Sequence, residues 1–175
     1  VSVYGEYLSN TIQKKPTGWR NGSYSGVLNE MGSHILDLTV YLFQLQNPVV
    51  SSKNVSSVVS DVDDIVDMKL REFGKDFHFY FNWVDPRFRK PVFKIKILFE
   101  DNSIVEFDQQ KATYIKDGII VFSKSVVDIA DSVPFYLRGI DFTNQMKSFV
   151  ENSGTCCTVD EALVTRKIIK QVLKK

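Results

Sequence analysis

His34 is the residue of this sequence best suited to proton transfer near neutral pH, because histidine ordinarily titrates there and the chain has only 2 histidines. Apolar residues recur at spacings of three and four over residues 27–43, which predicts a helix with one buried face. On that helix Glu30 and Asp37 lie at i−4 and i+3 from His34, on the same side. A neighbouring carboxylate can fix the tautomer of an imidazole and make it a stronger base. His34, with Glu30 and Asp37 beside it, is therefore a candidate for acid/base chemistry.

Other interpretations of these residues stay open. A helical histidine beside carboxylates is often a solvated surface pair or a core residue with satisfied hydrogen bonds. A metal site is a further alternative, with Glu30 and His34 as two ligands and His78 as a third, although zinc sites usually hold more His or Cys. Gly32 lies inside the expected helix, where glycine costs about 1 kcal/mol relative to alanine. Its presence indicates that another backbone or a ligand comes close there.

The segment before this helix, residues 14–25, is rich in Gly, Lys, Pro and Ser, which is typical of a loop. It contains Trp19 and Arg20. Arginine supplies paired donors for a carboxylate or phosphate, so this pair is a candidate substrate clamp; a tryptophan that packs on the domain is the alternative. A G-x-G-x-x-G phosphate loop is absent from the sequence, so we expect no dinucleotide site in it.

The remaining pattern predicts an α+β fold, a large, mostly antiparallel β-sheet with helices packed on one face. Strands are expected where β-branched and aromatic residues are dense or alternate with polar ones. The aromatic run 77–83 is expected to lie in the core and at a subunit interface, which predicts a homo-oligomer formed through the sheet. The expected strands are 1–8, 49–61, 65–73, 77–83, 93–99, 104–107, 112–115 and 119–122. A helix over 135–150, a stop at residues 152–154 and a last helix opened by a capping box of Thr158 and Glu161 follow.

Composition limits the classes of function. The 22 Lys and Arg nearly balance the 21 Asp and Glu, for a net charge of +1, and without a basic run nucleic acid is not an expected partner. No apolar stretch approaches the roughly 20 residues that span a bilayer, so no membrane association is expected. Cys156 and Cys157 are the only cysteines, and such neighbours rarely meet disulfide geometry, which favours a reducing cytoplasm. The chain opens directly on an expected strand, so we expect a single domain of a longer protein.

The expected helix also resembles a known pattern. Residues 25–38, Ser-Gly-Val-Leu-Asn-Glu-Met-Gly-Ser-His-Ile-Leu-Asp-Leu, are similar to the Gly-rich, acid-x-Gly-x-His-x-x-Asp segment of the glucose-fructose oxidoreductase, inositol dehydrogenase and rhizopine catabolism (Gfo/Idh/MocA) family. The segments 18–20, 142–154 and 158–163 resemble the same family's pattern, so the likeness covers essentially the whole chain. Glu30 stands where the family usually has Asp, and the single Gly26 replaces a run of glycines.

This resemblance implies that residues 1–175 are the C-terminal substrate-binding and oligomerisation domain of an NAD- or NADP-dependent dehydrogenase or reductase. The substrate would be a sugar, a polyol or a nucleotide-linked sugar. The N-terminal Rossmann domain, which carries the cofactor and a lysine in an E-K-P motif, would be missing, so this domain alone should bind no dinucleotide and should be inactive. The competing expectation is a non-enzymatic oligomerisation or ligand-binding module on the same fold.

By the same resemblance, His34 exchanges a proton with the substrate hydroxyl. The other candidate residues fall into two groups. The substrate contacts are Trp19, Arg20, Asn29, Tyr136 and Arg138, and the structural residues of the motif are Gly26, Gly32 and Asp37.

Overall fold

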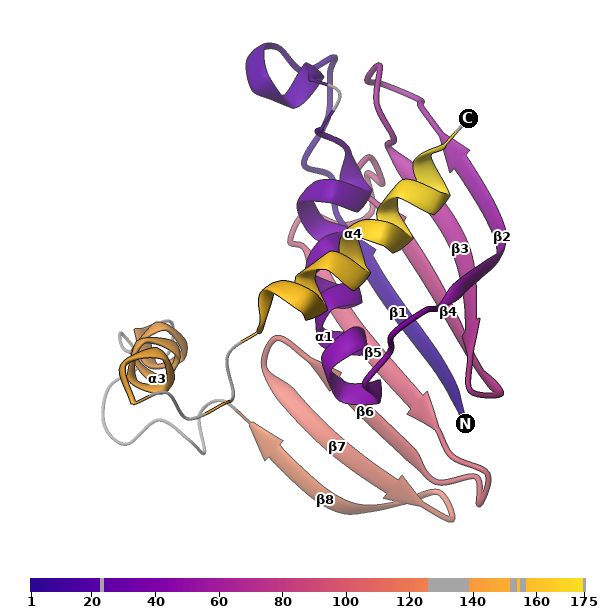
Figure 1. The fold of residues 1–175 in the computed structure, drawn as a ribbon, viewed down its shortest axis with the longest axis vertical. Coiled ribbons are helices and arrows are strands. Elements are labelled where there is room, and N and C mark those ends of the chain that lie inside the picture. Colours follow the sequence, from indigo (N-terminus) through magenta and orange to yellow (C-terminus); the bar gives the residue numbers. More distant parts are fainter. Residues whose placement is uncertain (23, 126–138, 152–153, 155–156, 175) are drawn as a thin grey trace.

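A single sheet carries most of the fold. The computed structural model describes residues 1–22, 24–125, 139–151, 154 and 157–174 (Figure 1). Within these ranges the sheet has eight strands in the order β2-β3-β4-β1-β5-β6-β7-β8. Their bounds are β1 Ser2–Leu8, β2 Val49–Ser56, β3 Ile65–Glu72, β4 Lys75–Asn82, β5 Val92–Leu98, β6 Ile104–Asp108, β7 Lys111–Lys116 and β8 Ile119–Ser125.

Only one neighbouring pair of these strands is parallel. Strand β1 runs parallel to β4, with Val3 opposite Phe77, and it runs antiparallel to β5. The other pairs are antiparallel and join strands that are consecutive in the chain. The expected turn between β7 and β8 is confirmed, because Asp117 and Gly118 both have positive φ, at 50° and 76°, as a two-residue hairpin turn requires. The predicted fold class is therefore confirmed.

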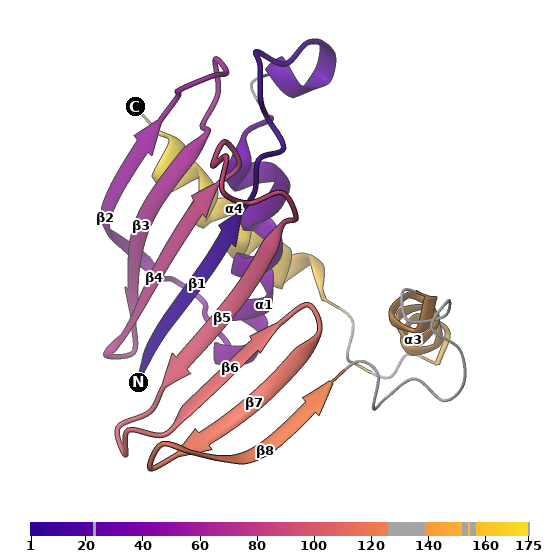
Figure 2. The same ribbon diagram turned by 180° about the vertical axis from the view of Figure 1, so that it is seen from behind.

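Helices α1 (Ser33–Phe43) and α4 (Val159–Leu173) lie across one face of the sheet, and the view from behind shows the other face uncovered (Figure 2). The expected helix over 27–43 is in fact two elements, since a π-helical turn, η2 (Leu28–Gly32), leads into α1. The predicted capping box of α4 is confirmed, with the Thr158 and Glu161 side chains each bonded to the other's backbone N–H. None of the helices in the described ranges is long and apolar enough to cross a membrane.

A third helix, α3 (Gly139–Val150), lies to one side of the sheet (Figure 1). The expected helix start at Phe135 and the stop at residues 152–153 lie outside the described residues. The strand expected over 49–61 ends earlier, at Ser56. The reason is that the Asp64 carboxylate accepts hydrogen bonds from the backbone N–H groups of residues 58–60 at 2.6–2.9 Å, which closes a loop where the strand was expected to continue.

The aromatic strand β4 is buried within the chain itself. Phe77, Phe79 and Phe81 are each 0% exposed, and they alternate with His78 and Tyr80 on the opposite face. Phe43 of α1 packs edge-on against Phe77, so these rings face the helices. The expectation that this strand lies in the core is confirmed for these three rings, whereas its expected role at a subunit interface stays a prediction, with His78 and Tyr80 on the face that no helix covers.

Candidate functional site

The N-terminus of the helical segment that carries His34 is held by a side chain from a distant loop. Asp63, between β2 and β3, accepts a hydrogen bond from the backbone N–H of Leu28 at 2.8 Å, and its carbonyl accepts one from the N–H of Val27 at 2.8 Å. A carboxylate suits this place, because the first N–H groups of a helix lack partners within the helix. Asp63 therefore fixes where the candidate catalytic helix starts.

Gly26 is required by this contact. Its φ is +118°, a conformation that side chains rarely adopt, and a Cβ built there would overlap the Asp63 carboxylate. The family pattern has several glycines at this point, and the single one present is the residue against which the carboxylate packs.

The environment of Asp63 changes its protonation. Burial raises the pKa of its carboxyl to about 6, against the opposing effect of the hydrogen bond from Leu28, and the nearby negative charges of Asp64 and Glu30 raise this pKa further. The pKa of Asp64 is instead lowered, because hydrogen bonds from Ser60, Trp83 and the adjacent backbone outweigh its burial. The Asp64 carboxylate thus stabilises its loop as an anion, whereas the Asp63 carboxylate takes up a proton near pH 6.

Glu30 has partners other than the ones the sequence suggested. Its two carboxylate oxygens lie 2.6 Å from the Ser25 hydroxyl, which donates a hydrogen bond, and 3.4 Å from the Arg20 guanidinium Nε. The same guanidinium stacks over the Trp19 ring, 5.0 Å from its centroid. The structure therefore brings Trp19, Arg20 and Glu30 together. The positive charge of Arg20 is paired with the carboxylate of Glu30.

His34 lies on α1 as an exposed side chain. Within the described part of the chain its ring has no hydrogen bond or ion pair, so the carboxylate contacts expected from helical spacing are not formed there. Ile35 and Leu36, the next two residues, are 0% exposed and anchor α1 to the sheet. The imidazole thus lies on the side of α1 away from the sheet, where a ligand or another domain could contact it.

Gly32 is explained by packing. A Cβ at this position would come within 2.9 Å of Leu28 Cδ1 and 3.2 Å of the Phe81 ring. The helical segment therefore approaches β4 too closely for a larger residue. The sequence led us to expect another backbone or a ligand at this position, but the close neighbours in the structure are the side chains of Leu28 and Phe81.

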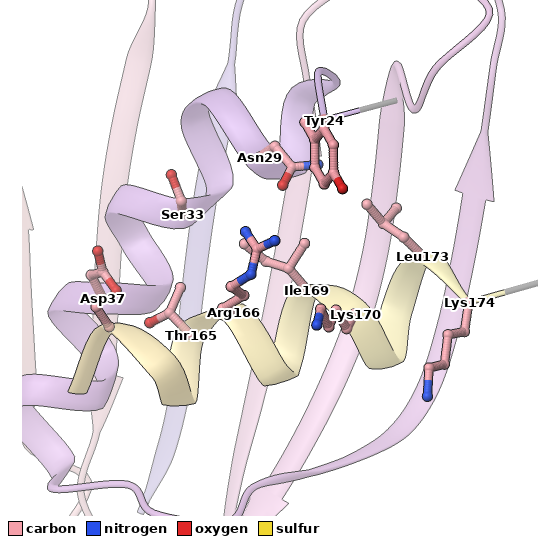
Figure 3. A pocket seen from close by; sticks show the side chains of 11 residues that line it. Tyr24, Asn29, Ser33, Asp37, Thr165, Arg166, Ile169, Lys170, Leu173 and Lys174 are labelled. Carbon is pink, nitrogen blue, oxygen red and sulfur yellow. The ribbon is translucent and has the colours of Figure 1, made fainter. Parts of the chain in front are cut away.

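A groove of about 470 Å³ runs between α4 and the helical segment that carries His34 (Figure 3). Asn29 of η2 and Ser33 and Asp37 of α1 line one side of it, and Thr165, Arg166 and Lys170 of α4 line the other. Ser33 is the neighbour of His34 in sequence, but His34 itself does not line the groove. Asn29 is oriented by a 3.3 Å hydrogen bond to the Ser25 carbonyl.

Some predicted residues are not part of this arrangement. Tyr136 and Arg138 lie outside the described residues. His78 is on β4, on the sheet face opposite the helices, where its Nε2 lies 2.7 Å from Asp67. It cannot complete a metal site with Glu30 and His34, and no group of three or more potential His, Cys, Asp or Glu ligands occurs among the described residues.

Asp63, Ser25, Thr165 and Arg166 were not singled out from the sequence. Asp63 contacts a residue 35 positions away, and neither periodicity nor spacing indicates a contact over such a distance. Arg166 and Thr165 lie at ordinary positions of an amphipathic helix, so their place in the groove depends on how α4 crosses α1.

The chain has no matching family model and no match among curated proteins. Solved structures do match over nearly its whole length. UDP-N-acetylglucosamine 3-dehydrogenase GnnA from Acidithiobacillus ferrooxidans aligns with a TM-score of 0.69 at 16% identity, over 98% of this chain and 51% of that one. GenD2 from gentamicin A biosynthesis, solved in complex with NAD, gives 0.67 at 14% identity, over 98% and 51%. A Gfo/Idh/MocA family oxidoreductase from Vibrio cholerae gives 0.57 at 15% identity, over 99% and 54%.

The fold is therefore that of one half of the Gfo/Idh/MocA-type dehydrogenases, and the resemblance of the sequence to the C-terminal domain of these proteins is confirmed at the level of the fold. The chain spans about half the length of the structures that it matches.

Proposed function

We propose that this chain is the substrate-binding, catalytic-histidine domain of an NAD(P)-dependent oxidoreductase that acts on a sugar, a polyol or a nucleotide-linked sugar. The observation that carries the proposal is the placement of His34. Its exposed imidazole lies on a helix whose start is fixed by Asp63 and whose residues Ser33 and Asp37 line a groove. The matched structures named as dehydrogenases support the reaction class.

The described residues do not fit a dinucleotide. Phosphates are usually cradled by a Gly-rich turn between a parallel strand and a helix, and the one parallel pair of this sheet, β1 with β4, has no such turn. We therefore assign the cofactor to a separate Rossmann domain of a longer protein. That domain would pack on the helix side of this one and close the site over His34.

The chemistry that we assign to this chain is proton transfer. Oxidation of a secondary alcohol requires the hydroxyl proton to leave, and the high pKa of an alcohol makes unassisted loss slow. An imidazole with an ordinary pKa of about 6.5 is suited to accept that proton. Glu30, held by Ser25 and Arg20, is the acidic group that we assign to the same site, although it makes no contact with the imidazole among the described residues.

The proposal is tested by expression of the longer protein and assay of NAD and NADP reduction with a panel of polyols, sugars and nucleotide-linked sugars. Turnover with at least one of these substrates supports it. Tight dinucleotide binding to residues 1–175 alone, measured by calorimetry, would contradict the division of roles between the two domains.

A scaffold without hydride transfer is the second candidate. The exposed apolar side chains of the edge strand β8, Ile119 to Phe122, are 54–69% exposed and favour a role in assembly. A longer protein that assembles through this strand but binds neither NAD nor NADP would establish the scaffold and exclude the enzyme.

A further inference from the structure

The groove between α1 and α4 has two chemically different ends. At one end Asp37 and Thr165 lie close to each other, and at the other the Arg166 guanidinium points toward Asn29 and Tyr24 (Figure 3). A ligand that fills the groove would contact both ends, so the groups at each end indicate its chemistry.

The Asp37 end contains polar atoms without partners. The Thr165 hydroxyl belongs to a side chain that is 4% exposed, and neither it nor Asp37 Oδ1 has a hydrogen-bond partner among the described residues. Buried polar atoms are normally paired. A carboxylate oxygen accepts hydrogen bonds and a threonine hydroxyl both donates and accepts, which suits the hydroxyl groups of a sugar.

The other end is cationic. Arg166 and Lys170 on α4 and Lys174 directly after its end follow one another at intervals of four and line the same groove. Within the described ranges, no carboxylate lies within 4.0 Å of any of their charged nitrogens. The Arg166 guanidinium lies over the Tyr24 ring, 5.8 Å from its centroid, which leaves its N–H edge available to an anion.

We propose that this groove binds the phosphate-bearing part of a phosphorylated sugar, either a simple sugar phosphate or a nucleotide-linked sugar. The phosphate lies at Arg166 and Lys170, and the sugar hydroxyls lie at Asp37 and Thr165. The carboxylate of Asp37 repels a phosphate from the end of the groove where Asp37 lies, and this repulsion determines which way round the ligand binds. This inference rests on the proposed function, because the helical segment that lines the groove is the one that carries His34.

Arg20 is less suited to the same task. Its guanidinium is already paired with Glu30 and stacked on Trp19, so an anion there would have to compete with a carboxylate of the chain. Arg166 faces no such competitor among the described residues, and the anionic subsite is accordingly assigned to α4.

The test is calorimetric titration of the full chain with glucose 1-phosphate, UDP-glucose and glucose. We expect saturable binding of at least one phosphorylated ligand and binding of glucose that is weaker by about tenfold or more. Arg166→Gln should lower the affinity for the phosphorylated ligand by about tenfold, as expected for the loss of one charge-assisted contact. Thr165→Val, which keeps the shape of the side chain, should weaken glucose 1-phosphate but not inorganic phosphate.

Lys167→Gln is the matched control, because it removes one positive charge from the same helix at a residue that lines a different cleft, beside Gln46. It should leave the affinity unchanged. Equal losses in Arg166→Gln and Lys167→Gln, or no binding of either phosphorylated ligand, would overturn the subsite. These experiments measure binding, so their results do not depend on whether His34 acts as a base. The proposed subsite and the proposed catalytic role of His34 can therefore be contradicted independently of each other. The two phosphorylated ligands also distinguish a simple sugar phosphate from a nucleotide-linked sugar.

Discussion

Asp63 connects a buried charge to the position of His34. Its carboxylate is 6% exposed and holds the backbone of Leu28, yet burial raises its pKa to about 6. The anion that caps the helix is therefore formed at a cost in stability. A residue that only stabilised the fold could be neutral, so this carboxylate is better explained by its role in positioning the helix.

The protonation of Asp63 predicts a specific pH dependence. Because its pKa in the folded chain lies above the ordinary 3.8, its contribution to the free energy of unfolding is greatest below about pH 4 and is lost as the pH rises through 6. The loss is about 3 kcal/mol in total, from roughly 1.4 kcal/mol per unit of pKa shift. In Asp63→Asn this dependence should be absent.

Urea unfolding of the chain and the variant from pH 4 to pH 7 measures this effect as the difference between their free energies of unfolding. Asp61→Asn is the control, since Asp61 lies in the same loop but is exposed, and its ion pair within the described ranges is with Lys15. Parallel curves for the chain and Asp63→Asn would show that Asp63 does not titrate as stated.

The helical segment illustrates how far the sequence predicts the site. Spacing of apolar residues indicates the helix and its buried face, and it places Glu30, His34 and Asp37 in order. It does not predict the π-helical turn or the partners of Glu30, because these depend on Asp63, Ser25 and Arg20 in segments outside the helix. The family resemblance indicated which residues matter, and long-range contacts determine what they touch.

Gly32 tests the close approach of this segment to β4. In a free helix Gly→Ala is stabilising by about 1 kcal/mol. Here Gly32→Ala should instead lower the free energy of unfolding by about 1–3 kcal/mol, because the added Cβ would press on Leu28 and Phe81 and overpacked cores are destabilised by that amount. Denaturant unfolding gives the sign of the change in the free energy of unfolding directly. A stabilised variant would show that Phe81 moves aside without a cost in free energy.

Helix α4 is held at its C-terminus by a lysine of the sheet. Lys53 of β2 donates from Nζ to the carbonyls of Gln171, Val172 and Lys174 at 2.7–2.8 Å. A cation at this end also suits the helix dipole. Sequence spacing gives no indication of this contact, which joins residues more than 100 positions apart.

Lys53→Met should therefore destabilise the chain by about 1 kcal/mol and increase hydrogen exchange in the last turn of α4. Lys69→Met is the comparison, because Lys69 lies on β3 and faces away from the helices. Equal hydrogen exchange at residues 170–174 in both variants would contradict a capping role for Lys53.

The molecule as a whole leaves its β8 edge uncovered. Helices α1 and α4 cover the part of the sheet around β1 and β4, whereas six of the seven β8 residues are exposed. Exposed apolar patches of this kind commonly mark protein interfaces. The oligomer expected from the sequence remains a prediction, and the exposed residues of β8 give it a second candidate surface besides the aromatic strand β4.

Self-association through β8 predicts that Ile120→Lys combined with Phe122→Lys yields a monomer at concentrations where the unmodified chain is larger. Sedimentation velocity over a range of concentrations measures the change. Val58→Lys, at an equally exposed residue outside the strand, should leave the association intact. An unmodified chain that stays monomeric throughout would exclude this interface.

The most direct test of the proposed function uses the two histidines of the chain in the longer protein. His34→Ala should reduce turnover by about 10² or more, the size of a general-base effect, with the fold retained because the side chain is exposed. His78→Gln, on the opposite face of the sheet, should retain turnover. Unchanged turnover in His34→Ala, or equal losses in both variants, would contradict the assignment of His34 as the acid/base.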